Sequence, residues 1–240
     1  MPVKTKPLKI GAQLFLLVLL GDALSIILGF TTLHIALKIM LMPILLAMTW
    51  QAYGKTKEGS LGLLSKGLFF AWAGDIFLLF DKSAPVFFLL GLGSFLLTHV
   101  FYILMFLKIN RKKANKQSFG TIAGTIAIVA YGIILVKTLW PFLNGLEAPV
   151  LVYALCICSM AVLALQTPAY YSKVTRALLI CGALLFVVSD SILAVNKFMT
   201  AGAWAPPSIM LTYGLAQLAI VAGVSNRPAS TYGEALAPGV

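Results

Sequence analysis

The stretch "AWAGDIFLLF" (residues 71–80) lies at the end of a long apolar run, 60–80, and this run decides the fold class. Nine of the ten residues in the stretch are apolar or glycine, and the tenth is Asp75. About 20 consecutive apolar residues are enough for a helix to cross the hydrocarbon core of a bilayer. The segment therefore predicts a transmembrane helix that carries a carboxylate.

Seven other runs have the same length and character, and short connections join most of them. We therefore expect an all-α polytopic membrane protein, a single bundle of eight transmembrane helices within residues 1–227, followed by a polar, disordered tail at 228–240. The first run follows a basic start without a convincing small-residue cleavage site, so it is expected to be an uncleaved helix. The eight runs are 10–30, 33–53, 60–80, 84–107, 119–139, 147–166, 173–195 and 206–224.

The composition agrees with a lipid environment. Hydrophobic residues make up 60% of the chain and charged residues only 10%, whereas a soluble domain has about 25% charged residues. A net charge of +11 would suggest nucleic-acid binding in a soluble protein. Here the basic residues cluster between apolar runs, which is typical of topology signals and contact with anionic headgroups. We therefore expect membrane lipids, and no nucleic acid, as partners.

The basic residues also predict the orientation. If the N-terminus is cytoplasmic, fourteen of the eighteen lysines and arginines fall on the cytoplasmic side, as the positive-inside rule requires. Both termini are then cytoplasmic. The four exceptions are Lys38, Lys82, Lys137 and Lys197.

Asp75 has a counterpart in the seventh run, Asp190 in "FVVSDSILAV" (186–195). Each aspartate lies about five residues before the outer end of its predicted helix, and Lys38 lies about five residues after the outer start of the second. These three charged groups are therefore expected at one depth. The segments 74–82 and 189–197 also match in Asp, Leu and Lys at identical spacing, which is consistent with a parallel repeat or with chance.

Two interpretations of the aspartates remain open at this point. A buried aspartate sometimes only pairs with a lysine to hold a bundle together, but intramembrane charge is costly and a functional role is the default. Two neighbouring carboxylates in a dry pocket cannot easily both ionise, so one keeps its proton and serves as an acid while the other serves as a base. Such a site would hydrolyse an acid-labile bond or carry protons in a transporter.

Other polar residues on the outward halves of the helices are candidates to complete this pocket. Tyr213 and Gln217 lie one helical turn apart and share a face, and so do His34 and Lys38. His99 is either a catalytic residue or a structural histidine between helices. The remaining candidates are Asp22, Asn196 and Lys197.

Several enzyme classes are disfavoured. The two histidines and three cysteines show no metal-ligand spacing, and the cysteines are expected to be buried thiols, so we expect no metal and no other cofactor. Ser189 precedes Asp190 but has no GxSxG elbow, which argues against a serine hydrolase. Glycines inside the runs are expected to be close-packing points between helices, namely Gly74, Gly91, Gly93 and Gly182.

The eight-run layout, together with three motifs, resembles the lysoplasmalogenase-like family, also called the YhhN-like family. The motifs are "GDIFLL" (74–79), "SDSILAVNKF" (189–198) and "MLTYGLAQLAIV" (210–221). The resemblance covers about residues 10–224 and keeps both aspartates.

The resemblance implies a membrane-embedded hydrolase that cleaves the sn-1 vinyl ether of lysoplasmalogens. Its products would be a fatty aldehyde and glycerophosphoethanolamine or glycerophosphocholine. A vinyl ether is labile to acid, so Asp190 is expected to be the acid and Asp75 the base. Lys38 or Lys197 would bind the phosphate of the lysophospholipid beside Asn196, and Tyr213 and Gln217 would orient its glycerol hydroxyl. The expected location is a bacterial inner membrane.

Two alternatives remain. A proton-coupled transporter would use the same aspartates as proton carriers and the repeat as its moving halves. A non-catalytic lipid-binding or scaffold protein would tolerate the loss of both acids.

Overall fold

The computed structural model describes residues 6–81, 83–111 and 118–226. Lys82 and the predicted tail at 228–240 lie outside the described residues.

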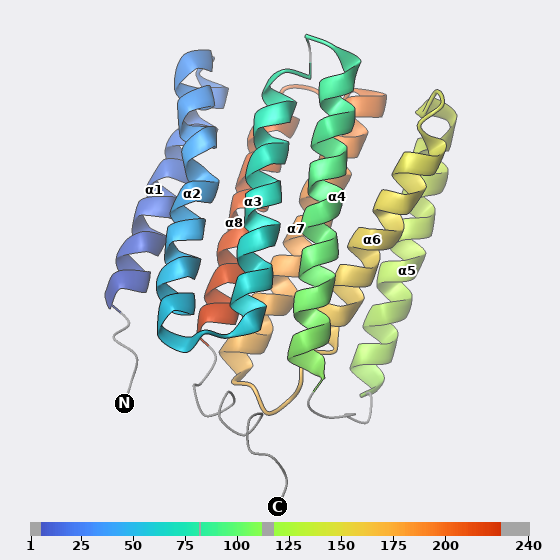
Figure 1. The fold of residues 1–240 in the computed structure, drawn as a ribbon. Helices are drawn as coiled ribbons and strands as arrows, with labels where there is room; N and C mark the ends of the chain where they lie inside the picture. Colours follow the sequence, from blue (N-terminus) through green and yellow to red (C-terminus); the bar gives the residue numbers. More distant parts are fainter. Residues whose placement is uncertain (1–5, 82, 112–117, 227–240) are drawn as a thin grey trace, which may run out of the picture.

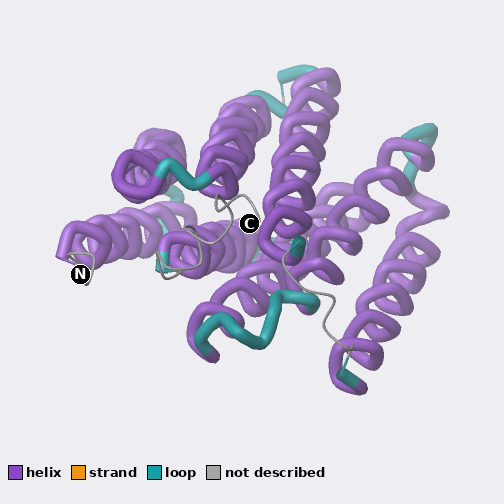
Figure 2. Tube along the Cα trace, turned by 60° about the horizontal axis from the view of Figure 1, so that its bottom comes forward, coloured by secondary structure: helices purple, strands orange, loops and turns teal. Residues whose placement is uncertain are grey.

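The described chain is helical, as Figure 2 shows, with short loops between long helices and no strand in the described ranges. Eight of its helices are long and apolar enough to cross a membrane. This confirms the predicted all-α bundle of eight transmembrane helices and identifies an integral membrane protein. The helices are α1 (Lys6–Ile27), α2 (Thr31–Thr56), α3 (Gly59–Leu79), α4 (Pro85–Asn110), α5 (Phe119–Leu139), α6 (Glu147–Leu165), α7 (Lys173–Met199) and α8 (Ala205–Ser225), with a short 3-10 turn η1 (Trp140–Phe142) after α5.

The helices alternate in direction, so α1 begins and α8 ends at the same end of the bundle (Figure 1). The loops from α3 to α4 and from α7 to α8 lie at the opposite end, which is the upper end in Figure 1. We call the end that carries these two loops the loop end. The assignment of the two ends to the two sides of the membrane stays a prediction.

The centre of the bundle is built on glycine contacts within the α3–α4 and α7–α8 pairs. An added Cβ at Gly74 would lie 2.8 Å from the Phe95 ring, and one at Gly182 would lie 3.0 Å from the Ala216 carbonyl oxygen. Gly91 similarly faces Leu78. Gly93, in contrast, has no atom within 4 Å of its added Cβ, so its predicted role in packing is wrong.

Helix α5 lies at the edge of the bundle (Figure 1) and packs mainly on α6, with a smaller contact to α7. Only 11% of its apolar span is buried, compared with 39% for α3, α4 and α7. Its outward side chains include Ile126 and Ile134, which are 64% and 63% exposed. In a membrane protein this surface faces lipid.

Helix α7 is longer than its apolar run predicts. It continues past residue 195 to Met199, so Asp190 lies nine residues before its end (199 − 190) and not five. The extra turn is held by Lys197, whose Nζ lies 2.9 Å from Asp81 Oδ2 and 4.5 Å from the centre of the Phe88 ring. Because Asp81 and Lys197 follow Asp75 and Asp190 by six and seven residues, this contact supports a similar depth for the two aspartates.

Candidate functional site

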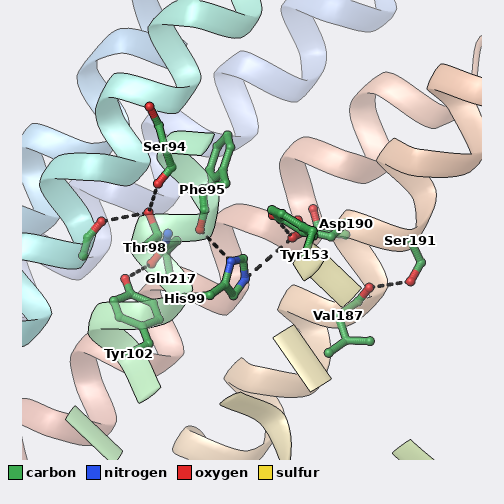
Figure 3. A network of polar contacts seen from close by, with 12 residues as sticks. Ser94, Phe95, Thr98, His99, Tyr102, Tyr153, Val187, Asp190, Ser191 and Gln217 are labelled. Carbon is green, nitrogen blue, oxygen red and sulfur yellow. Dashed lines mark hydrogen bonds and ion pairs between the residues drawn. The ribbon is translucent and has the colours of Figure 1, made fainter. Parts of the chain in front are cut away.

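Asp190 on α7 is held by residues from two other helices. The Tyr153 hydroxyl on α6 donates a hydrogen bond of 2.5 Å to Asp190 Oδ2. His99 Nε2 on α4 lies 3.7 Å from the same oxygen (Figure 3). The Asp190 side chain keeps 12% of its surface exposed. A carboxyl group with one phenol donor and one imidazole neighbour therefore faces the interior of the membrane-spanning region.

The backbone sets the orientation of the His99 ring. Its Nδ1 lies 2.6 Å from the Phe95 carbonyl oxygen, and because a carbonyl only accepts, Nδ1 must carry the hydrogen. In the neutral ring Nε2 then has a free lone pair, and this atom is buried without a hydrogen-bond partner among the described residues. At 3.7 Å from Asp190 Oδ2 this nitrogen is beyond hydrogen-bonding distance of the carboxyl group, so a buried proton acceptor lies beside the acid without being bonded to it.

Asp190 and Tyr153 line a pocket with otherwise largely apolar walls, which we call the apolar pocket. Side chains from α3 to α7 surround it, with α5 closing one side. Its lining also includes Leu78, Phe88, Leu92, Phe95, Leu135, Val136, Val150, Ile157, Leu193 and Phe198. The carboxyl group of Asp190 is thus presented to a space suited to hydrocarbon.

Asp75 on α3 has a separate set of partners. The Tyr213 hydroxyl on α8 donates a hydrogen bond of 2.8 Å to Asp75 Oδ2. Lys38 Nζ on α2 lies 3.9 Å from Asp75 Oδ1. Asp75 is only 2% exposed, whereas Lys38 reaches a second pocket, described next.

The second pocket, which we call the polar pocket, lies at the loop end. Lys38 and His34 of α2 line it opposite Asn196 and Lys197 of α7, with Asp81 beside them. Asp22 on α1 fixes the orientation of the His34 ring, because His34 Nδ1–H donates a hydrogen bond of 2.7 Å to Asp22 Oδ1. This leaves Nε2 as the other polar atom of the ring. Three of the predicted binding residues, Lys38, Asn196 and Lys197, thus share one pocket.

The polar and apolar pockets share part of their walls. Leu78, Phe88 and Leu193 line both. The Phe88 ring contacts Lys197 of the polar pocket and packs edge-on against Phe198 of the apolar pocket, with ring centres 6.0 Å apart. Charged side chains around Lys38 thus adjoin the apolar walls around Asp190.

The two aspartates are not joined directly. No hydrogen bond or ion pair links Asp75 to Asp190 in the described part of the chain, and each has its own partners. Aromatic rings connect the two groups of residues. The Phe186 ring centre lies 5.6 Å from that of Tyr213 and 4.8 Å from that of His99. The carboxylates therefore belong to two clusters, an acidic cluster at Asp190 and a charged cluster at Asp75.

Tyr213 and Gln217 share one face of α8, as their spacing predicts, but they contact protein groups. Tyr213 bonds Asp75, and Gln217 Oε1 accepts a hydrogen bond of 2.5 Å from the Tyr102 hydroxyl (Figure 3). Neither side chain lines the apolar or the polar pocket. Their predicted contact with a glycerol hydroxyl stays a prediction.

Sequence reasoning missed Tyr153 and the pairing of His99 with Asp190. Tyr153 lies six residues after the start of α6, close to the seven-residue distance of Lys38 from the start of α2. Counting residues from the outer helix end, which selected Lys38, would therefore also have selected Tyr153. His99 lies fourteen residues into α4 (99 − 85), and no such count places it beside Asp190.

No group of three His, Cys, Asp or Glu side chains within the described residues is placed to hold a metal ion. The three cysteines are free. Cys156 and Cys158 are partly buried, but Cys181 is exposed on α7, so its predicted burial is wrong.

The chain is similar in sequence to proteins named lysoplasmalogenase. Two lysoplasmalogenases, from Mycobacterium bovis and Mycobacterium tuberculosis, are 30% identical over 140 residues, which are 57% of this chain and 50% of each relative. Lysoplasmalogenase TMEM86A from Bos taurus is 30% identical over 172 residues, covering 69% of this chain and 67% of the relative. The chain spans about half the length of the mycobacterial relatives. No solved structure matches it.

The YhhN family pattern matches residues 33–224, a range that contains both aspartates, both pockets' α7 residues and the α8 motif. Since this match spans most of the chain, the protein belongs to the YhhN family.

Proposed function

We propose that this protein hydrolyses the vinyl ether of lysoplasmalogens. The observation that carries the proposal is the position of Asp190, a carboxyl group beside an imidazole on the wall of an apolar pocket that adjoins a polar one. The name lysoplasmalogenase, shared by the relatives at 30% identity, supports the same substrate class.

The reaction begins with proton transfer to carbon. The Asp190 carboxyl protonates the β-carbon of the vinyl ether, and its electron pair remains on the carboxylate. The positive charge that develops is shared by the α-carbon and the ether oxygen as an oxocarbenium ion. The new carboxylate stabilises this ion where water is scarce, which strengthens the interaction.

His99 completes the cycle. Water adds to the α-carbon, and the lone pair on His99 Nε2 takes its proton, giving a hemiacetal. The protonated ring then returns this proton to the ether oxygen as the carbon–oxygen bond breaks, while the Asp190 carboxylate accepts the hemiacetal proton. Aldehyde and glycerophospho alcohol leave, and both residues regain their starting forms. The hydrogen bond from Nδ1 to the Phe95 carbonyl keeps Nε2 aimed at this site.

The charged cluster serves the headgroup. Lys38 provides donors for the phosphate in the polar pocket, where His34 lies beside it, and Asp75 and Asp22 hold these two side chains in place. Asp75 then acts as a positioning residue, because both of its oxygens contact protein groups. With the cytoplasmic termini that the basic residues indicate, the headgroup would bind at the outer leaflet of a bacterial inner membrane.

A panel of lysolipids tests the proposal. Purified protein in detergent is expected to release aldehyde from 1-alkenyl lysophospholipids. Saturated 1-alkyl ethers should be inert, because they cannot form the cation by protonation at carbon. Acyl esters should be poor substrates, because Ser191 and Cys158 on the pocket wall donate to backbone carbonyl oxygens, and no base among the described residues activates either one. Mass spectrometry of the products measures all three.

The same panel separates the enzyme from a transporter. An enzyme forms aldehyde without a second compartment, whereas a transporter requires one. Absence of aldehyde from every 1-alkenyl lysolipid, combined with proton flux in sealed vesicles, would reject the hydrolase and favour the transporter.

A further inference from the structure

A second apolar space lies on the outside of the bundle, between α5 and α6. We call it the outer groove. It is lined by Ile133, Leu151, Leu155 and Val162, with Lys137 and Trp140 among its other lining residues. Leu155 is 61% exposed and Ile133 is 52% exposed, so the groove opens toward lipid. Lys and Trp near the end of a transmembrane helix are typical contacts for phospholipid headgroups.

Only a thin wall separates the outer groove from the apolar pocket. Gly132 and Val136 of α5, with Ala154 and Cys158 of α6, line both spaces. Three of these four residues are small. A Cβ added at Gly132 would lie 2.7 Å from Cys158 Sγ, so the α5 backbone packs directly on this thiol. The contact between α5 and α6 therefore forms the wall between the outer groove and the apolar pocket.

The helix that forms one side of this wall is the least buried of the eight. Helix α5 packs mainly on α6, and only 11% of its apolar span is buried. An outward movement of α5 would therefore break few contacts and would join the outer groove to the pocket that holds Asp190. Asp190 itself belongs to α7, which packs closely on α8 and would keep its place.

We propose that the seam between α5 and α6 is a lateral port through which the hydrocarbon chain of a single-chain phospholipid passes from the bilayer to Asp190. This inference rests on the proposed function. The occupant is a lipid chain because the groove is apolar, faces the bilayer and shares a wall with the apolar pocket. Lys137 at the groove complements the phosphate of such a lipid, whose chain never has to leave an apolar environment.

A removable link across the seam tests the port. In a protein with Cys156→Ala and Cys181→Ala, the change Gly132→Cys places a second thiol against Cys158, within the reach of a disulfide. Oxidation would join α5 to α6, and reduction would release them. The matched control also carries Cys158→Ala and cannot form the link. Each protein is compared with itself before and after oxidation.

Two readouts are measured. The first is the hydrolysis rate of a 1-alkenyl lysolipid. The second, independent of hydrolysis, is photolabelling by a lysolipid with a diazirine in its chain, followed by mass spectrometry of labelled peptides. We expect oxidation to lower both the rate and the labelling of α4 and α7 at least about tenfold, because gating steps limit many enzymes. Labelling of the outer groove should persist, and reduction should restore both signals.

Several outcomes are decisive. If the linked protein keeps its rate and its inner labelling within twofold, the port is wrong. If reduced protein is labelled at α4 and α7 but forms no aldehyde, the port stands and the proposed function fails. Unmodified protein supplies a test that does not depend on the variant. Groove labelling no stronger than labelling around Leu17, a lipid-facing residue of α1 that is 71% exposed, would overturn the port.

Discussion

Replacement of Asp190 by Asn is expected to lower kcat at least about 10²-fold, the usual scale for a general acid. The amide has nearly the same shape, and its oxygen still accepts the hydrogen bond from Tyr153, so the fold should be kept. What it lacks is the acidic proton for the vinyl ether. Steady-state kinetics of aldehyde release measure the loss, and thermal unfolding in detergent checks the fold.

KM of the Asp190→Asn variant should change little. The headgroup contacts lie in the polar pocket, which Asp190 does not line. Full activity in this variant would exclude Asp190 as the acid. Loss of activity together with loss of thermal stability would instead assign the residue a structural role.

Replacement of Asp75 by Asn is expected to lower kcat/KM about 10²-fold, mainly through a higher KM. The change removes the negative group that holds Lys38 at the polar pocket, while the hydrogen bond from Tyr213 is kept. Kinetics against lysolipid concentration separate the two parameters. A lower kcat at unchanged KM would contradict this positioning role and make Asp75 the base, as the sequence had suggested.

Asp81→Asn is the matched control for Asp75→Asn. It removes a carboxylate that also lines the polar pocket but pairs, in a partly exposed position, with Lys197, which the proposed headgroup contact does not use. Such pairs contribute about 0–1 kcal/mol, so its kcat/KM should stay within about fivefold of the unchanged protein. A loss as large as that of Asp75→Asn would show that any charge removed at the loop end has this effect.

The double variant Asp75→Asn/Asp190→Asn distinguishes two clusters from one catalytic dyad. Residues that act in separate clusters have effects that multiply, whereas residues that act as a unit give a double variant little worse than either single one. Asp75 and Asp190 have separate hydrogen-bond and ion-pair partners, which favours the multiplicative result.

Sequence reasoning predicted the eight helices because each apolar run must match the thickness of the bilayer. The same run lengths predicted one depth for Asp75, Asp190 and Lys38, and the structure pairs Lys38 with Asp75. The position of a residue along its helix axis can thus be predicted from the sequence. The direction in which a side chain points around the helix axis cannot be predicted in this way, because it depends on which neighbours pack against each face.

This limit explains the differences at the site. Counting residues cannot reveal that Phe186 packs against both His99 and Tyr213, or that Tyr153 and His99 both lie beside Asp190. It also cannot show that Tyr213 contacts Asp75 and not a pocket. The end of α7 was misplaced for a related reason. Asn196 and Lys197 end the apolar run, but the helix continues through them because Lys197 pairs with Asp81, a contact far away in the sequence.

The most direct test of the central claim, acid attack on the vinyl ether, is hydrolysis of a 1-alkenyl lysolipid in ¹⁸O-water. Water that adds to the oxocarbenium ion enters on the vinyl side, so the glycerophospho product keeps the ether oxygen of the substrate. The aldehyde exchanges its own oxygen with water and cannot report. We predict, by mass spectrometry, a glycerophospho product without ¹⁸O. Incorporation of ¹⁸O into that product would mean cleavage on the glycerol side and would contradict the mechanism.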